Sequence, residues 1–271
     1  MFYIYTMIRS VGYNPYSYTP CFKARLEQQA LPEQQDSIAS SGLSVAALYM
    51  ISQGINAASE GVSKALMRGK EYTTPDNVLK VVDKMVENGK LNGITVQFIN
   101  QKNVGFVSKL TGIPVADLMD VAQGKNAFFM NAKNLAVAPS AKPSLIQHEL
   151  GHAINAKSPF WKTMQNSRRY IANIPAALFL TSLIVKKMKG SNEDTFIDKH
   201  AGKLGFAAYL PTIIEEAAAS IRGIQAAKKT LGGNVKLGAL RKNYFLAWLT
   251  YLLAGIGFGV ATKISVKTGI L

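Results

Sequence analysis

The sequence predicts an α+β fold that is predominantly helical, with a small sheet and one to three membrane-associated helices. Three observations indicate this class. β-branched and aromatic residues gather in short segments of the first half, which is typical of strands. Apolar residues recur at helical spacing elsewhere, in places between capping residues. The second half contains long runs without a charged residue, as membrane-associated helices do.

The first half is expected to combine amphipathic helices with three strands. In the segment 73–90, Thr74 is placed as an N-cap, Pro75 occupies the first helical position and Gly89 follows as a stop, so a helix is predicted between them. One face of that helix is apolar: Val78, Val81, Val82 and Met85. Strands are predicted at 93–100, 126–131 and 134–139, and a short helix at 115–121. The uncharged segment 37–59 also has helical spacing and is expected either to enter the membrane or to pack on the rest of the protein.

Three uncharged runs dominate the second half, at 170–185, 204–214 and 244–262. Only the last comes close to the roughly 20 residues that cross a bilayer. The first contains Asn173 and Pro175, which leaves a broken span, half of a hairpin or a buried helix as alternatives. Aromatic residues near the start of the last run would suit an interfacial belt: Tyr244, Trp248 and Tyr251.

A length of 271 residues predicts one functional unit rather than several independent domains. We expect three regions within it. Residues 1–40 form a loosely ordered lead-in, residues 41–160 hold helices and the small sheet, and residues 161–271 form a membrane-associated helical part.

Composition and charge favour a membrane protein that faces a reducing compartment. Apolar residues make up 48% of the chain and its mean hydropathy is +0.08, which fits a mixed soluble and embedded body. Cys21 is the single cysteine, so no intramolecular disulfide can form. The first residues lack the basic stretch and cleavage site of a signal peptide, so targeting is expected from internal segments. The net charge of +15 lies largely beside apolar runs, as in cytoplasmic flanks of membrane helices, and nucleic acid is not an expected partner.

The segment HELGH at 148–152 predicts a metal site. Pro143 can open a helix through it, and His148 and His152, four residues apart, then lie on one face where both imidazoles reach one Zn²⁺. Glu149 can take a proton from a metal-bound water. The chain has only three histidines, so two in this pattern argue against a chance match. Gly151 would let a neighbouring backbone approach closely.

A catalytic zinc needs a third protein ligand and an open position for water. No histidine follows within AINAKSPFW, so the metzincin arrangement is absent. Downstream, YLPTIIEEAAASIRGIQ offers Glu215 or Glu216 in an apolar helix, where a carboxylate pair is costly without a cation nearby. The alanines at 217–219 would let this helix pack tightly against the histidine helix. Ser220, one turn beyond Glu216, can support a metal ligand.

The strings HELGHA and LPTIIEEAAASIR resemble the bacterial membrane-bound neutral zinc metallopeptidase family of YugP type. That family has an HExGHA helix and a later LP-x-E-x-x-A-S-x-R segment. The correspondence places its Glu on Glu216, its Ala-Ser on Ala219 and Ser220, and its Arg on Arg222. It covers roughly residues 126–225. The chain departs from it by two extra residues before Glu216, by a missing acidic residue in the second motif and by a weakly hydrophobic N-terminal helix. The resemblance implies a zincin-like core of gluzincin type, a feature shared more distantly with prenyl-protein-processing and heat-shock membrane peptidases.

These patterns together indicate a membrane-associated zinc metalloendopeptidase with Glu149 as general base. Its expected partners are a peptide or membrane-protein substrate and the lipid bilayer, and its expected location is the inner (plasma) membrane with the site near the cytoplasmic face. An extended substrate would pair with an edge strand, either 128–131 or 135–138. His200, Tyr209 and Arg222 are candidates to assist the oxyanion, each with an ordinary structural alternative. The competing class is a non-catalytic zinc-stabilised membrane scaffold or membrane-binding protein. The sequence does not indicate an oligomeric state.

Overall fold

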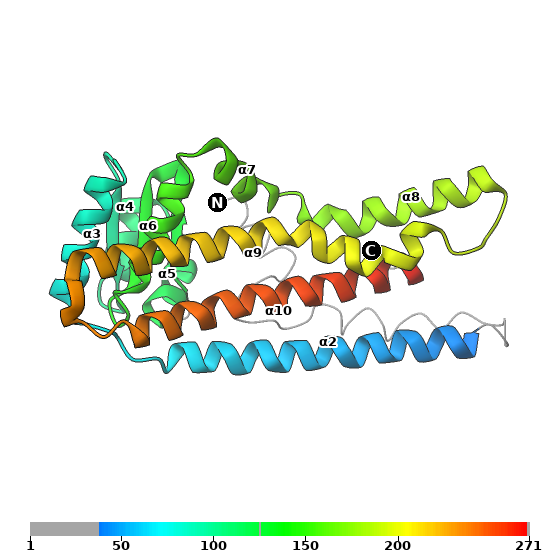
Figure 1. Ribbon diagram of the computed structural model, residues 1–271, viewed down its shortest axis with the longest axis horizontal. Coiled ribbons are helices and arrows are strands. Elements are labelled where there is room, and N and C mark those ends of the chain that lie inside the picture. Colours follow the sequence, from blue (N-terminus) through cyan, green and yellow to red (C-terminus); the bar gives the residue numbers. More distant parts are fainter. Residues whose placement is uncertain (1–37, 125, 270–271) are drawn as a thin grey trace. The chain divides into compact units, whose positions relative to one another are not determined.

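The computed structural model describes residues 38–124 and 126–269 (Figure 1). Contacts within the chain divide it into two units. Unit 1 contains Val62–Asn166 and Ile214–Leu249. Unit 2 contains residues 38–61, Ser167–Ile213 and residues 250–269. The predicted lead-in falls mostly on residues 1–37, outside the described residues, while residues 38–40 begin the first described helix.

Helices dominate both units, and the predicted helical fold with a small sheet is confirmed. In chain order the elements are α2 (Ile38–Met67), α3 (Pro75–Asn88), β1 (Thr95–Ile99), α4 (Val104–Thr111), α5 (Val115–Ala122), β2 (Phe128–Met130), η1 (Asn131–Lys133), β3 (Leu135–Pro139), α6 (Leu145–Asn155), α7 (Pro159–Ser167), η2 (Ile171–Asn173), α8 (Ile174–Lys189), α9 (Phe196–Leu231), η3 (Gly232–Asn234) and α10 (Gly238–Thr268). The long helices α2, α9 and α10 contribute residues to both units.

Helix α3 begins and ends where its sequence predicts. The side chain of Thr74 accepts a hydrogen bond from the N–H of Asn77, and Pro75 occupies the first turn, where no intrahelical N–H bond is lost. Gly89 caps the other end, where an added Cβ would lie 2.8 Å from a side-chain carbon of Ile154. The stop is therefore also a point of close contact with α6.

The sheet of unit 1 has three strands in the order β1-β3-β2. β1 runs parallel to β3, with Thr95 opposite Leu135, and β2 runs antiparallel to it, with Phe129 opposite Ala136. β3 is the central strand, so the prediction that residues 135–138 could offer an edge to a substrate is wrong. β2 and β1 are the two edges.

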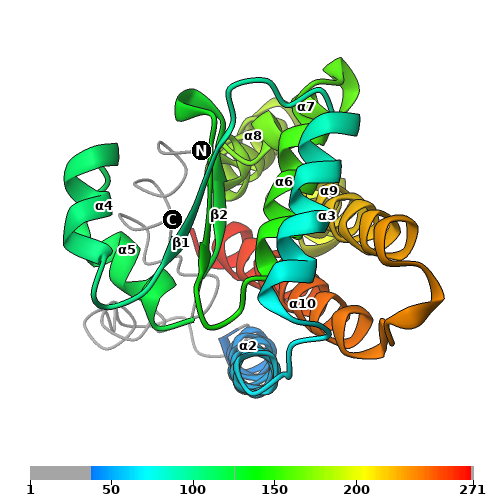
Figure 2. The same cartoon turned by 90° about the vertical axis from the view of Figure 1, so that its left-hand side faces the viewer.

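Two cores lie on opposite faces of this sheet because successive strand residues alternate in direction. Phe129, Ala136 and Ala138 face a core shared with α3 and α6. Phe128, Met130 and other strand residues face a core shared with α4 and α5. Figure 2 shows the two helix pairs on either side of the sheet. The small residues of β3 face α6, which lets that helix lie close to the sheet.

In unit 2, α9 and α10 pack through glycine. A Cβ added at Gly259 would lie 2.7 Å from the carbonyl oxygen of Gly202, and one added at Gly255 would lie 2.8 Å from a side-chain carbon of Ile213. Gly205 likewise contacts Thr262. Such close approach through small residues is how helices associate where lipid provides no hydrophobic driving force between them.

Two helical segments of the described chain are long and apolar enough to cross a membrane: Ile171–Lys189 and Gly238–Thr268. In the first, Asn173 and Pro175 start α8 rather than interrupt it. The alternative of a buried helix is wrong for this segment, because Ser182 is its only buried residue and Ile184 and Met188 are exposed.

The other segment, α10, is in part a core helix of unit 1. Its first turns belong to unit 1, where Leu240 and Tyr244 are almost fully buried in the core with α3 and α6. Tyr244 donates a hydrogen bond to the carbonyl of Ser144. The predicted place of Tyr244 in an interfacial aromatic belt is therefore wrong.

Asp198 helps to cap the N-terminus of α9 in unit 2. One of its oxygens accepts from the hydroxyl of Ser182, and the other accepts from the N–H of Thr195 and from Lys186. The N–H of Asp198 donates in turn to the hydroxyl of Thr195, which completes a capping box. Burial alone would raise the pKa of Asp198, but these donors outweigh it and lower the pKa from 3.8 to about 2.

We therefore expect Asp198→Asn to destabilise the protein by about 1 kcal/mol at neutral pH, as the loss of a helix cap does. The depressed pKa means that the carboxylate stabilises the fold above pH 3.8 and that this contribution is lost as the pH falls towards 2. Thermal unfolding in detergent should show a gap in melting temperature between wild type and variant, and this gap should close as the pH falls over this range. Asp194→Asn, an exposed neighbour, is the control; a gap that persists at pH 2 would contradict the assignment.

Candidate metal centre

Helix α6 brings the two histidines of the HELGH segment together in unit 1. His148 and His152 lie one turn apart, and their rings meet edge to face with centroids separated by 4.5 Å. Their Nε2 atoms are 3.0 Å apart, and both residues are buried. The two nitrogens therefore point at the same small volume.

Helix α9 adds a carboxylate to this pair. Glu216 Oε2 lies 3.1 Å from His148 Nε2 and 3.5 Å from His152 Nε2. A tetrahedral ion with bonds of about 2.0–2.1 Å has ligand atoms separated by about 3.3 Å. The three observed separations bracket that value, so His148, His152 and Glu216 form a buried group that can hold a metal ion.

The close packing of α6 against α9 makes this geometry possible. A Cβ added at Gly151 would lie 2.9 Å from the Cα of Ala219, which no real side chain could tolerate. One turn further along α9, a Cβ at Gly223 would lie 3.2 Å from the carbonyl oxygen of Gln147. Gly151 and the thin alanine run thus have the role that their sequence suggests: they let two backbones approach closely.

The outward nitrogen of each imidazole has its own partner. His148 Nδ1 lies 3.1 Å from the hydroxyl of Ser220, and His152 Nδ1 lies 2.9 Å from Glu215 Oε1. Partners at Nδ1 fix the ring orientation and leave Nε2 free to bind a metal. Glu215 therefore supports His152, and Glu216 is the carboxylate that lies among the ligand atoms.

The Glu215 carboxylate is itself held by amides. Its Oε1 accepts hydrogen bonds from Asn155 at 3.0 Å and from Gln165 at 2.7 Å. Gln165, on α7, also donates to the carbonyl of His152. Arg222 donates through Nε to Asn155 Oδ1 at 2.5 Å. The orientation of His152 thus depends on a connected set of side chains from α6, α7 and α9.

Burial and charge make this centre attractive to a cation. Glu149, Glu215 and Glu216 are each at most 4% exposed. Desolvation raises the pKa of Glu149 above its ordinary value, against the opposing effect of both histidines. Desolvation would lower the pKa of His152, but Glu215 and Glu216 outweigh it and raise that pKa well above its ordinary value. A cation bound among these three buried carboxylates and two imidazoles would stabilise their negative charge.

The remaining predicted residues lie outside the ligand group. Glu149 is on α6 between the two histidines, and within the described chain its carboxylate accepts no hydrogen bond. Arg222 contacts Asn155 rather than the ligand atoms. His200 and Tyr209 belong to unit 2, where their rings lie against Phe196 and Phe258.

Three residues around the centre escaped sequence reasoning. Asn155 follows His152 by three residues on the same helical face, a spacing that could have suggested it. Gln165 carries no sequence signal, because its role depends on how α7 folds back onto α6. Tyr244, whose ring centroid is 5.6 Å from that of His148, was hidden by the apolar run around it.

Comparison of the chain with protein-family models, curated proteins and solved structures gave no match.

The α6–α9 contact makes Gly151→Ala a test of the centre. The added methyl group must push Ala219 away, so we expect a loss of stability of about 1–3 kcal/mol and a lower metal content in the purified protein. Thermal unfolding and elemental analysis measure the two effects. Gly105→Ala, on α4 where nothing lies within 4 Å of the new Cβ, is the matched control. It should leave metal content unchanged and raise stability by about 0.5–1 kcal/mol; equal behaviour of both variants would contradict the contact.

Proposed function

We propose that the protein is a membrane-associated zinc metalloendopeptidase with a zincin-like core of gluzincin type. The observation that carries this proposal is the convergence of His148 Nε2, His152 Nε2 and Glu216 Oε2, with Glu149 next to the first ligand. The resemblance to the YugP-type family supports the same assignment.

The donor set favours zinc over harder cations. Two imidazoles and one carboxylate suit Zn²⁺, whereas Mg²⁺ and Ca²⁺ prefer oxygen ligands. Three protein ligands leave one tetrahedral position for water or substrate, as in catalytic rather than structural sites. The partners at both Nδ1 atoms, Ser220 and Glu215, are the kind of support that such ligands receive.

Glu149 is the proposed general base. When bound, zinc would polarise the peptide carbonyl and make a water molecule more acidic. Glu149 accepts the proton from this water and delivers it to the leaving nitrogen. Burial raises the pKa of Glu149, which suits a carboxylate that must hold a proton briefly. The support that Asn155, Gln165 and Glu215 give His152 keeps the ligand in place during the reaction.

The strand β2 is the proposed binding edge for the scissile segment of a substrate. It is an edge strand, and its partner β3 connects to α6 through a short segment, so the chain leads directly from this sheet to the histidines. An extended peptide can add to such an edge by main-chain hydrogen bonds.

Membrane association is supported by the two apolar helical segments and by the glycine contacts of unit 2. Leu180, Ile184 and Met188 recur at helical spacing along an exposed face of α8, where lipid would cover them. The lysines in the last turn of α8, at 186, 187 and 189, suit the cytoplasmic boundary of a span, and the lone cysteine suits a reducing compartment. We place the protein in the inner (plasma) membrane, with its centre near the cytoplasmic face.

The catalytic assignment predicts different effects for two conservative substitutions. Glu149→Gln should keep zinc and lower the rate of casein hydrolysis by on the order of 10²- to 10⁴-fold, because the base is lost. Glu216→Gln should lower zinc content as well as activity, because a ligand is weakened. Zinc is measured by elemental analysis of the purified protein, and activity with and without a chelator.

Glu193→Gln, an exposed residue of unit 2, is the matched control and should change neither quantity. A Glu149→Gln variant that cleaves casein at the wild-type rate would refute the role of Glu149. A wild-type protein that binds zinc and cleaves nothing would favour the scaffold alternative.

The membrane assignment predicts that the full chain stays in the membrane fraction after an alkaline carbonate wash and needs detergent for extraction. Placing Asp at Leu180 and Leu183 should reduce this retention, because each charge near the middle of the span 171–189 costs about 2.5–3.5 kcal/mol. Asp at Leu79, an exposed apolar position on α3, is the control and should have no effect. A wild-type chain recovered in the soluble fraction would contradict the assignment.

A further inference from the structure

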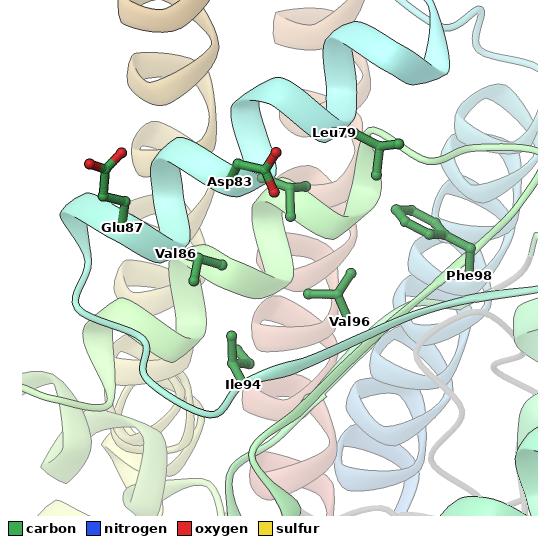
Figure 3. Close-up of a pocket in the computed structure, with 8 residues that line it drawn as sticks. Leu79, Asp83, Val86, Glu87, Ile94, Val96 and Phe98 are labelled. Carbon is green, nitrogen blue, oxygen red and sulfur yellow. The ribbon is translucent and has the colours of Figure 1, made fainter.

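A groove of about 580 Å³ lies between α3 and β1 in unit 1 (Figure 3). Most of its lining is apolar, and two carboxylates from α3 stand among these side chains. The lining residues are Leu79, Val82, Asp83, Val86, Glu87, Ile94, Val96 and Phe98. None of them belongs to the metal centre, so the groove has no role in the proposed chemistry as described above.

The strand that forms one wall has an open backbone edge. The N–H of Thr95 donates to Asn134, and the carbonyl of Ile99 accepts from Ser140, so residues of this parity bond towards β3. In a parallel pair the alternate residues, Val96 and Phe98, direct their backbone groups away from β3. Asn103 already donates to the carbonyl of Phe98. Within the described part of the chain, nothing hydrogen-bonds to the N–H or C=O of Val96.

An open strand edge beside an apolar groove favours an extended polypeptide as the ligand. Main-chain N–H and C=O groups in extended order match those of another extended polypeptide. Ile94, Val96 and Phe98 point towards α3, so the groove would take alternate side chains of such a strand. Lipid or a compact small molecule would leave the open backbone groups of Val96 without partners.

The charges beside the groove indicate which side chain an incoming strand would carry there. Glu87 forms an ion pair with Lys84 at 2.6 Å. Asp83 is exposed and has no ion-pair partner among the described residues. A Lys or Arg of the incoming strand would complement Asp83.

We propose that this groove is a docking site for an extended polypeptide segment with apolar residues at alternate positions and a basic residue beside Asp83. The proposal deepens the function proposed above and rests on it in one respect: the segment belongs to the protein substrate and binds away from the scissile bond. β1 and β2 are opposite edges of the sheet, so a segment on β1 leaves β2 open.

The test uses the full chain carrying Glu149→Gln, so that the probe is not cleaved. The probe is a fluorescein-labelled peptide of sequence KVTVTVK, and its matched control is EVTVTVE. We expect fluorescence anisotropy to show binding of the basic peptide and binding of the acidic one weaker by about two- to fivefold or more, since an exposed ion pair contributes that much. Equal binding of both peptides, or binding of neither, would overturn the proposal.

Backbone pairing is tested from both partners. N-methylation of alternate valines in the probe removes its donors without touching the protein and should weaken binding by about fivefold or more. Val96→Pro removes the free N–H at an edge where proline is tolerated and should have the same effect, whereas Val96→Ile should not. Asp83→Asn should abolish the preference for the basic peptide, and Asp76→Asn, on the same helix outside the groove, should preserve it. A peptide affinity that changes neither on N-methylation of the probe nor on Asp83→Asn would also overturn the proposal.

Failure of this proposal is distinguishable from failure of the peptidase assignment. Chelator-sensitive cleavage of casein by the wild-type chain without any peptide binding refutes the docking site alone. Peptide binding with the expected sensitivity, in a chain that cleaves nothing, supports the docking site and refutes the enzyme.

Discussion

The close approach of α6 and α9 at Gly151 and Ala219 is the constraint on which the candidate metal centre depends. The carboxylate of Glu216 and the imidazoles of α6 meet across a helix pair whose backbones nearly touch. Burying Glu215 and Glu216 would cost several kcal/mol each without compensation. The packing of glycine against alanine places both carboxylates against nitrogen atoms, and this supplies that compensation.

The helix α6 also packs closely against the sheet. Ala136 and Ala138 face α6 from the central strand, so the histidine helix is in contact with small residues on its sheet side as well as on its α9 side. Larger residues of the same strand, Leu135 and Val137, face the other core. The strand β3 therefore presents small side chains to α6, where space is restricted. It presents larger side chains to the core with α4 and α5, which they fill.

The residues predicted well are those whose role follows from local spacing. Four-residue separation places His148 and His152 on one helical face, and capping chemistry defines α3. What could not be predicted depends on tertiary contact. Helix α4 has no proline at its start comparable to Pro114, which precedes α5, a predicted helix of the same length. The amide of Gln165 reaches Glu215 only after the chain turns back, and an apolar run concealed that Tyr244 is a core residue. Local sequence also could not decide which strand is central, because the pairing order is set by distant segments.

The first turns of helix α10 determine how the candidate metal centre could be separated from the long apolar helices. Leu240 and Tyr244 of α10 complete the core around α3 and α6, and the hydroxyl of Tyr244 donates a hydrogen bond to the carbonyl of Ser144, just before α6. Truncation ahead of this helix would therefore expose the core and loosen the histidine helix. A fragment that keeps unit 1 whole would have to divide this apolar helix within its own length, after Leu249, and retain its first turns.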